Sequence, residues 1–343
     1  MNQNMKSATQ TEAVESHRGA AGLCPACGRA ESIDLFKAPD RFHGRDKSYS
    51  LVRCTSCSLV RLQDPPPPSE IGEHYGARYD GAISGPGDDP NHWRERRDAL
   101  SLFKSGGALL DLGCSSGGFL ASMQGPSWKL SGVEMSETVA KRARERCGAE
   151  VFVGDILDAP FPPGSFDAIT CFHVFEHLYQ PREVLARVSA WLKPGGVFYT
   201  MMPNIDSAGA RIFQSYWYAL ELPRHLYHFS PKSLRALANG VGLEVVSLTT
   251  NREMFIEHSM RYVFDGIIRK IGYSRPPLAE SPAPGIPWRA ARKIFRLTLL
   301  PVLTGIGSLA GDGESMHAVF EKRAPGSDQP GNTARLSKTR RFC

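Results

Sequence analysis

The feature that constrains the fold most is a regular alternation of short apolar runs with helical patterns, which begins at residue 107. Turn glycines and helix-capping residues separate the two kinds of segment. The expected strands are 108–113, 129–134, 150–153, 166–172, 196–202, 243–249 and 316–321, and the expected helices are 117–124, 136–147, 181–192 and 230–238. Strands joined by helices pair in parallel, and helices cover both faces of the sheet. The sequence therefore predicts a doubly wound α/β sheet with its ligand site at the carboxyl ends of the strands.

The turn after the first expected strand carries the strongest ligand signal. It reads Asp111-Leu-Gly113-Cys-Ser115-Ser-Gly117, whereas a dinucleotide-binding turn has glycine at the position of Ser115 so that the backbone can approach a pyrophosphate. Asp111 would also repel a phosphate, because both groups are anionic. The turn instead suits a ligand that carries a cationic amino group and no phosphate.

Two further acidic residues extend this site along the sheet. Glu134 ends the second expected strand, 21 residues after Gly113, where a carboxylate can bind both hydroxyls of a ribose. Asp155 follows the third expected strand and can reach an adenine amine. An amino acid, a ribose and an adenine together describe S-adenosylmethionine as the cofactor.

A series of short motifs runs in order along residues 107–250. They are Asp111-x-Gly113-x-x-x-Gly117, Glu134, Gly154-Asp155, Phe166-Asp167-Ala168, Phe172-His173-x-x-Glu176-His177-Leu178, Leu192-Lys193-Pro194-Gly195-Gly196 and Pro203-Asn204. This series resembles the class I S-adenosylmethionine-dependent methyltransferases, and Ser115 departs from their usual middle glycine. The resemblance implies a seven-stranded Rossmann-like sheet whose last strand is antiparallel. It implies cofactor contacts from Asp111, Gly113, Ser115, Gly117, Glu134, Asp155, Ile156 and Phe172.

The cysteines before this region form two C-x-x-C pairs. Cys24 and Cys27 precede Cys54 and Cys57 by 26 intervening residues, the arrangement of a four-thiolate zinc ribbon. Four thiolates close a tetrahedral shell, so we expect a structural zinc ion. The alternatives are four free thiols or a redox pair, but a redox C-x-x-C needs a thioredoxin-like helix that is not visible here. A disulfide framework is not expected, because residues 1–20 show no apolar secretory segment.

These features divide the chain into five parts. We expect a disordered tail (1–20), a zinc ribbon (21–64), a proline-rich linker with helices (65–106), a methyltransferase domain (107–323) and a disordered basic tail (324–343). A helical insertion at 251–314 interrupts the last hairpin of the domain. It could cap the acceptor pocket, mediate dimerisation or, through 294–309, contact a membrane surface beside a lipid-linked substrate. The sequence does not indicate an oligomeric state.

The charge pattern bears on the partner. The formal net charge is +6, but residues 322–343 alone hold six basic residues against one acidic residue. The remainder is nearly balanced and holds no transmembrane run, so we expect a cytoplasmic protein that acts on a small molecule and not on nucleic acid. Two alternatives stay open: an RNA methyltransferase that uses the zinc ribbon as a nucleic-acid clamp, and a binding scaffold without catalysis.

Histidines supply the candidate catalytic groups. His173 ends the fourth expected strand, where it would face the cofactor, and Glu176 and His177 follow it. His225 and His228 lie in an aromatic segment after the fifth strand, where enzymes of this class cover the methyl acceptor. A general base helps transfer to a hydroxyl or an acidic carbon, so we expect an oxygen or carbon of a sugar, a lipid-linked compound or another secondary metabolite. The alternative roles are a structural pin for the Glu176-His177 pair and helix packing for the aromatic residues.

Overall fold

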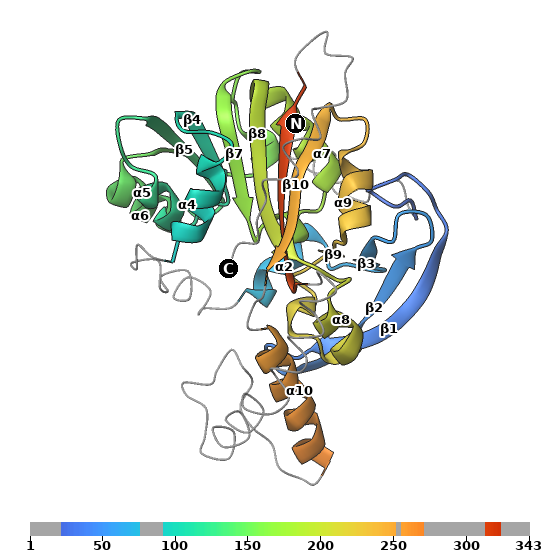
Figure 1. The fold of residues 1–343 in the computed structure, drawn as a ribbon. Helices are drawn as coiled ribbons and strands as arrows, with labels where there is room; N and C mark the ends of the chain where they lie inside the picture. The colour runs from blue at the N-terminus through green and yellow to red at the C-terminus, as the bar shows by residue number, and fades with distance from the viewer. Residues whose placement is uncertain (1–21, 76–91, 252–254, 271–312, 324–343) are drawn as a thin grey trace, which may run out of the picture.

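The computed structural model describes residues 22–75, 92–251, 255–270 and 313–323, and its centre is a seven-stranded sheet with the order β10-β11-β8-β7-β4-β5-β6 (Figure 1). The strands are β4 (Gly107–Leu112), β5 (Trp128–Glu134), β6 (Glu150–Val153), β7 (Phe166–Phe172), β8 (Leu192–Pro203), β10 (Leu243–Asn251) and β11 (Ser315–Lys322). Strands β4 to β8 pair in parallel, and β11 pairs antiparallel with both β8 and β10. The predicted sheet and its antiparallel last strand are confirmed.

Helices cover both faces of this sheet (Figure 1). On one face α4 (Arg94–Ser101), α5 (Gly118–Ser122) and α6 (Glu137–Cys147) bury apolar side chains against Leu109. On the other face α7 (Pro181–Trp191) and α9 (Pro231–Ala238) pack in one cluster with Leu110. The predicted caps are present: Ser136 accepts from the Val139 N–H, and Ser230 forms a reciprocal capping box with Ser233.

The first strand is fixed at its start by a carboxylate from β7. Asp167 accepts hydrogen bonds from the Ala108 N–H at 2.8 Å and from Lys193 Nζ at 2.7 Å. A Cβ on Gly107 would lie 2.3 Å from the Asp167 carboxylate, and Gly107 has a φ of +122°. The Phe-Asp-Ala and Leu-Lys-Pro motifs therefore serve to join strands β4, β7 and β8.

A second sheet of four strands joins the N-terminal region to a segment far along the chain. Its order is β1 (Ser32–Asp40), β2 (Arg45–Cys54), β3 (Val60–Leu62) and β9 (Tyr227–His228). Strand β9 pairs antiparallel with β3, with Val60 opposite His228. Figure 1 shows this sheet beside the end of the central sheet from which α8 (Ala208–Phe213) leaves. The segment expected to cover the methyl acceptor is thus built onto the N-terminal region.

Short elements complete the described fold. They are α2 (Pro68–Ile71), η1 (Gly72–His74), η2 (Ile156–Asp158), η3 (Phe175–His177), η4 (Gln214–Tyr216), η5 (Tyr218–Leu220) and α10 (Phe255–Lys270). Helix α10 packs against α8, η4 and η5. Among the described helices, none is both long enough and apolar enough to cross a membrane. The expected tails and most of the insertion, with its segment 294–309, lie outside the described residues.

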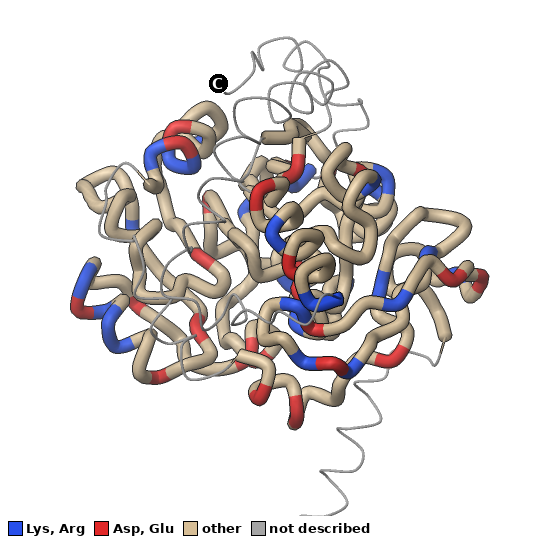
Figure 2. The backbone as a smooth tube through the Cα atoms, turned by 90° about the horizontal axis from the view of Figure 1, so that it is seen from below, with Lys and Arg blue, Asp and Glu red and all other residues tan. Residues whose placement is uncertain are grey.

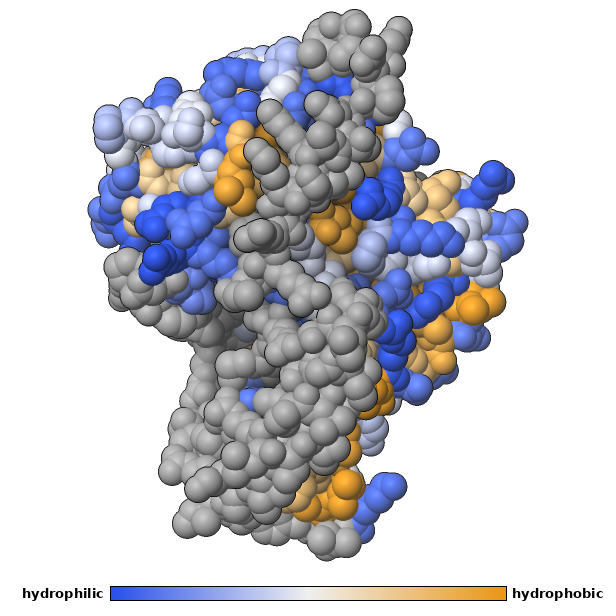
Figure 3. Space-filling view, in the orientation of Figure 1, coloured by the Kyte–Doolittle hydropathy of each residue, from blue (hydrophilic) through white to orange (hydrophobic). Residues whose placement is uncertain are grey.

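The described surface carries mixed charge. On the face drawn in Figure 2, basic and acidic residues are interspersed, and the described part of that face shows no continuous basic track. On the face drawn in Figure 3, the apolar residues form small separate areas. The large apolar side chains exposed on the described residues are Leu23, Ile33, Leu102, Met135, Ile212 and Ile267.

Candidate functional site

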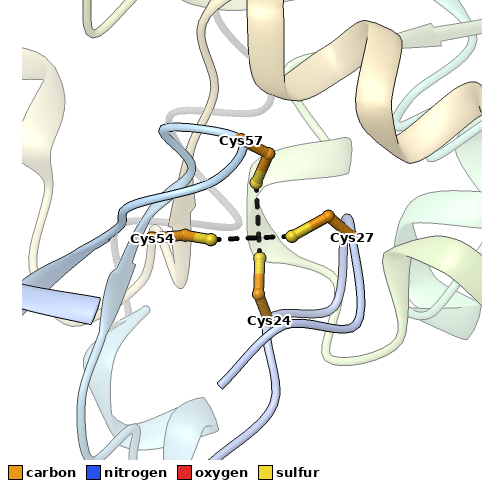
Figure 4. Close-up of side chains that lie close together, drawn as sticks. All are labelled: Cys24, Cys27, Cys54 and Cys57. Atoms are coloured by element: carbon orange, nitrogen blue, oxygen red, sulfur yellow. Dashed lines mark hydrogen bonds between the residues drawn. The ribbon is translucent and has the colours of Figure 1, made fainter. Parts of the chain in front are cut away.

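The four cysteines of the two C-x-x-C pairs converge on one point (Figure 4). Their Sγ atoms all lie within 4.8 Å of one another, and the Cys24–Cys57 and Cys27–Cys54 sulfur distances are both 3.5 Å. A tetrahedral zinc ion with Zn–S bonds of about 2.3 Å would place its sulfurs about 3.8 Å apart. The hydrogen bond between Cys24 and Cys57 lowers the pKa of Cys24 and raises that of Cys57, so the two sulfurs share one proton that a metal ion would displace. The donor set therefore fits zinc.

Both cysteine turns have the same backbone form. The Gly28 N–H donates to the Cys24 carbonyl at 2.8 Å, and the Ser58 N–H donates to the Cys54 carbonyl at 3.0 Å. Gly28 and Ser58 have φ values of +72° and +67°, which let each chain turn back after its second cysteine. The knuckles also belong to the buried cluster that contains side chains of α7 and α9, and Arg182 of α7 donates to the Ala26 carbonyl at 3.3 Å.

The glycine turn after β4 is built from three left-handed residues. Gly113, Ser115 and Gly117 have φ values of +69°, +50° and +77°. A Cβ on Gly113 would lie 2.4 Å from Val174 Cγ2, and one on Gly117 would lie 2.9 Å from Ala143 Cα. These two positions therefore require glycine, whereas Ser115 keeps its strained conformation while its N–H donates to Glu134 Oε2 at 3.0 Å.

Asp111 is a buried carboxyl group at the carboxyl end of β4. Its side chain accepts a hydrogen bond from Thr170 Oγ1 at 2.7 Å. Burial raises the pKa of Asp111 to about 7, although the Thr170 hydrogen bond and the positive charge of Arg96 act in the opposite direction. A cationic ligand would favour the ionised form, because opposite charges attract strongly where water is excluded.

Glu134 and Asp155 are held in place by backbone N–H groups. Glu134 ends β5 and accepts from Ser136 N–H through Oε1 and from Ser115 N–H through Oε2, both at 3.0 Å. Asp155 is exposed after β6 and caps η2 by accepting from the Leu157 N–H at 2.8 Å. Each carboxylate oxygen has more than one lone pair, so both groups can accept further hydrogen bonds from a ligand.

The expected cofactor set also includes two apolar residues, Ile156 and Phe172. Ile156 is buried directly after Asp155. Phe172 ends β7 and packs edge-on against Phe119 and Tyr199, with ring centroids 4.9 and 5.0 Å away. The eight expected cofactor contacts thus lie at the carboxyl ends of the neighbouring strands β4, β5, β6 and β7.

Arg96 on α4 is a candidate that the sequence analysis missed. Its guanidinium carbon lies 4.8 Å from the centre of the Trp93 ring and 5.5 Å from that of Phe172, and its charge lowers the pKa of Asp111. The sequence showed only that a helix precedes the first strand. The effect of this charge on Asp111 follows from the way α4 packs over α5.

His173 and Glu176 form a pair just beyond β7. His173 has a φ of +54°, and its Nδ1 lies 3.4 Å from Glu176 Oε1. Glu176 is 1% exposed, and its Oε2 has no hydrogen-bond partner among the described residues. Burial alone would raise the pKa of Glu176, but the hydrogen bond and positive potential of His173 hold that pKa below its ordinary value. An ionised carboxylate therefore lies behind a histidine that is 36% exposed.

The other three histidines donate to backbone carbonyls. His177 Nδ1 donates to Arg224 O at 3.0 Å, His225 Nδ1 to Ala219 O at 2.9 Å, and His228 Nε2 to Leu220 O at 3.1 Å. Burial lowers the pKa of His177, lowers that of His225 well below its ordinary value, and lowers that of His228 to about 4. All three are therefore neutral near pH 7. The structure brings them together, since the ring centres of His177 and His225 are 4.6 Å apart and those of His225 and His228 are 6.2 Å apart.

Part of this histidine cluster has the donor groups of a metal site. One ligand atom each from Glu176, His177 and His225 lie within 4.8 Å of one another. The positive charge of Arg224 acts on the same groups, because it lowers the pKa of both His177 and His225. A neighbouring cation opposes a divalent ion, so we interpret the cluster as a hydrogen-bonding network.

The segment expected to form the acceptor wall is mostly packed inward. Phe213 and Trp217 are 8% and 1% exposed. Arg224 donates to Glu221 Oε2 at 2.6 Å and its guanidinium carbon lies 4.5 Å from the centre of the Phe42 ring. The hydroxyl of Tyr75 lies 3.3 Å from His177 Nδ1. Residues before the central sheet therefore border the histidine cluster, which no local sequence pattern indicated.

Comparison with known proteins identifies the domain. The family model described as "Methyltransferase domain" matches residues 88–248. The chain is 30% identical over 175 residues to a ubiquinone biosynthesis O-methyltransferase of Thiobacillus denitrificans, covering 46% of this chain and 71% of that protein. It is 29% identical over 218 residues to an uncharacterized 37.1 kDa protein of a Streptomyces fradiae transposon, covering 57% of this chain and 60% of that one. A crystal structure of an S-adenosylmethionine-dependent methyltransferase from Archaeoglobus fulgidus superposes with a TM-score of 0.48 at 16% identity, covering 71% of this chain and 98% of that one.

Proposed function

We propose that this chain, which belongs to the S-adenosylmethionine-dependent methyltransferases, transfers a methyl group to a hydroxyl oxygen of a small-molecule acceptor. The observation that carries this proposal is the His173–Glu176 pair at the carboxyl end of β7. Val174, the next residue, packs against Gly113 of the glycine turn. The name of the Thiobacillus relative supports oxygen as the methylated atom.

Each residue of the proposed cofactor site would bind a different group of S-adenosylmethionine. When bound, S-adenosylmethionine would supply a methyl group on a sulfonium, whose carbon an acceptor oxygen can attack while S-adenosylhomocysteine leaves as the thioether. The ionised Asp111 would hold the amino group, Arg96 the carboxylate and Glu134 the two ribose hydroxyls. Asp155 would accept from the adenine amine. Each contact is a charge-assisted hydrogen bond, the stronger kind in proteins.

His173 is the general base in this proposal. If its Nδ1–H donates to Glu176, its Nε2 is left to accept the acceptor's hydroxyl proton as the new C–O bond forms and the C–S bond breaks. The buried carboxylate of Glu176 then stabilises the imidazolium that results. The 3.4 Å separation is long for a hydrogen bond, and catalytic hydrogen bonds often tighten only when substrate is bound.

The other histidines act as positioning residues. Their donated hydrogen bonds to Ala219, Leu220 and Arg224 connect η3 and β9 to the turn at 219–224. The four cysteines would hold one structural zinc ion, because the shell of four thiolates leaves no position for a substrate. That ion would fix the β2–β3 hairpin to which β9 pairs.

Incubation with S-adenosylmethionine carrying an isotopically labelled methyl group tests the proposal. The acceptors are a panel of phenols, catechols and hexoses, together with total RNA, and the products are analysed by mass spectrometry and NMR. The expected result is a labelled methyl ether on a small molecule. Labelled RNA would favour the nucleic-acid alternative, and a methyl group on carbon would contradict the assignment to oxygen.

A further inference from the structure

Arg182 joins the first cysteine knuckle to two helices of the methyltransferase domain. It is the second residue of α7, and its Nη1 donates to the Ala26 carbonyl at 3.3 Å. Ala26 lies between the expected zinc ligands Cys24 and Cys27, 156 positions away from Arg182 along the chain. The proposed function gives this arginine no role.

The other hydrogen bonds of Arg182 go to the end of α9. Its Nη1 also donates to the Leu237 carbonyl at 3.4 Å, and its Nη2 donates to the Asn239 carbonyl at 3.2 Å. The last carbonyls of a helix have no partner within the helix, and a cation near them is favourable because of the helix dipole. One planar guanidinium therefore binds a carbonyl of the knuckle together with two carbonyls of α9.

The peptide group between Ala26 and Cys27 connects Arg182 to a zinc ligand. Its carbonyl accepts from Arg182, and the backbone N–H groups of Ala26 and Cys27 donate to the Cys24 sulfur. Hydrogen bonds in a chain polarise one another, so a guanidinium on the carbonyl makes the Cys27 N–H a stronger donor. A stronger donor stabilises the thiolate of Cys24, which is the form that binds a metal ion. The contact therefore acts on the ligand as well as on the fold.

The positive charge of Arg182 also suits a filled zinc site. Four thiolates outweigh the charge of one zinc ion, so the filled site carries a net negative charge. Cys24, Ala26, Cys54 and Cys57 are each at most 3% exposed, so water screens this charge only weakly. A guanidinium at the Ala26 carbonyl therefore stabilises the filled site more than the empty one.

The two helices that Arg182 binds follow the segments that carry the histidines. Helix α7 comes after η3, and α9 comes after β9. Tyr227 of β9 packs against the cluster that contains the cysteines, and its hydroxyl donates to the Tyr179 carbonyl, just before α7, at 3.1 Å. The knuckle is thus joined to both histidine segments of the proposed acceptor side.

We propose that Arg182 is a positioning residue of the zinc site, which holds the peptide between Ala26 and Cys27 and joins the knuckle to α7 and α9. The inference rests on the structural zinc ion of the proposed function. Zinc affinity then depends on a side chain of the methyltransferase domain, and not on the two knuckles alone.

The zinc affinity of the full chain, measured by competition with a chromogenic chelator, tests this role. Arg182→Met should weaken zinc binding about tenfold or more, the usual effect of losing a group that orients a metal ligand. Arg182→Lys keeps the charge but not the planar fork of donors, so it should weaken zinc binding less. Arg187→Met removes the same charge from an exposed position of α7 and should bind zinc like the parent protein.

Ser230→Ala separates this role from a general loss of stability. It removes the capping box at the opposite end of α9, so it should lower the melting temperature and leave the zinc affinity unchanged. Thermal melting and S-adenosylhomocysteine binding establish that each variant is folded. If Arg182→Met does not fold, Arg182→Lys must still bind zinc more weakly than the parent protein.

Two results would overturn the role of Arg182 alone: parental zinc affinity in the Arg182 variants, or an equal loss of zinc affinity in Ser230→Ala. A parent protein that binds no zinc would overturn it together with the zinc assignment of the proposed function. If zinc binding behaves as expected but no hydroxyl compound is methylated, the proposed reaction fails and the role of Arg182 stands.

Discussion

The pH dependence of cofactor binding should report the ionisation of Asp111. In the free protein, burial raises the pKa of this carboxyl group to about 7, so the group is mostly neutral below pH 7. Only the ionised form pairs with the ligand's amino cation, so affinity should fall as the pH falls. With that pKa, the ionised fraction drops from about 0.9 at pH 8 to about 0.1 at pH 6, which predicts about a tenfold loss of affinity.

Calorimetric titration of S-adenosylhomocysteine between pH 6 and 8 measures this effect. Asp111→Asn should bind about tenfold or more weakly at pH 8, because a charge-assisted hydrogen bond is lost, and its affinity should lose most of this pH dependence. Thr170→Val should move the wild-type profile to higher pH, because the Thr170 hydrogen bond lowers the pKa of Asp111. A flat wild-type profile, or an equal slope in Asp111→Asn, would refute this role for Asp111.

Three other predictions follow from the same geometry. Glu134→Ala should weaken S-adenosylmethionine binding about tenfold or more, because Glu134 would hold two ribose hydroxyls. Asp155→Ala should weaken it less, because Asp155 would hold one amine. Equal affinities of the two variants by calorimetry would contradict this order. Elemental analysis should find about one zinc per chain and not two, since four thiolates form one closed site; a second metal ion lost in Glu176→Gln would show that the histidine cluster binds metal. Cys54→Ser should abolish zinc binding and impair methyl transfer, because β3 pairs with β9. S-adenosylhomocysteine should still bind, because the cofactor residues lie at the ends of β4 to β7. Loss of S-adenosylhomocysteine binding in that variant would contradict the separation of the two sites.

The central sheet was predictable because its signals are local. Apolar runs, the caps at Ser136 and Ser230 and the turn at Gly113 each specify structure within a few residues. Parallel pairing then brings the strand ends to one edge, so Asp111, Glu134 and Asp155 could be assigned to one site from their positions alone.

The contacts between distant segments were not predictable in this way. Strand β9 has two residues, and it exists because β3 offers it an edge across more than 160 positions of sequence. Arg96 likewise lies near Asp111 only because α4 packs over α5. The position of His173 at a strand end was predictable, but only the hydrogen-bond partners show that it pairs with Glu176, whereas the other three histidines donate to backbone carbonyls.

The single-turnover rate of methyl transfer in His173→Ala tests most directly whether His173 is the general base. The measurement uses saturating S-adenosylmethionine and the hydroxyl acceptor that the labelled-methyl assay identifies. The expected rate is about 10²–10⁴-fold below that of the parent protein, with S-adenosylhomocysteine affinity unchanged, because the hydroxyl proton would have no base to accept it. A His173→Ala protein that transfers methyl at the parent rate would contradict the assignment of His173 as the base.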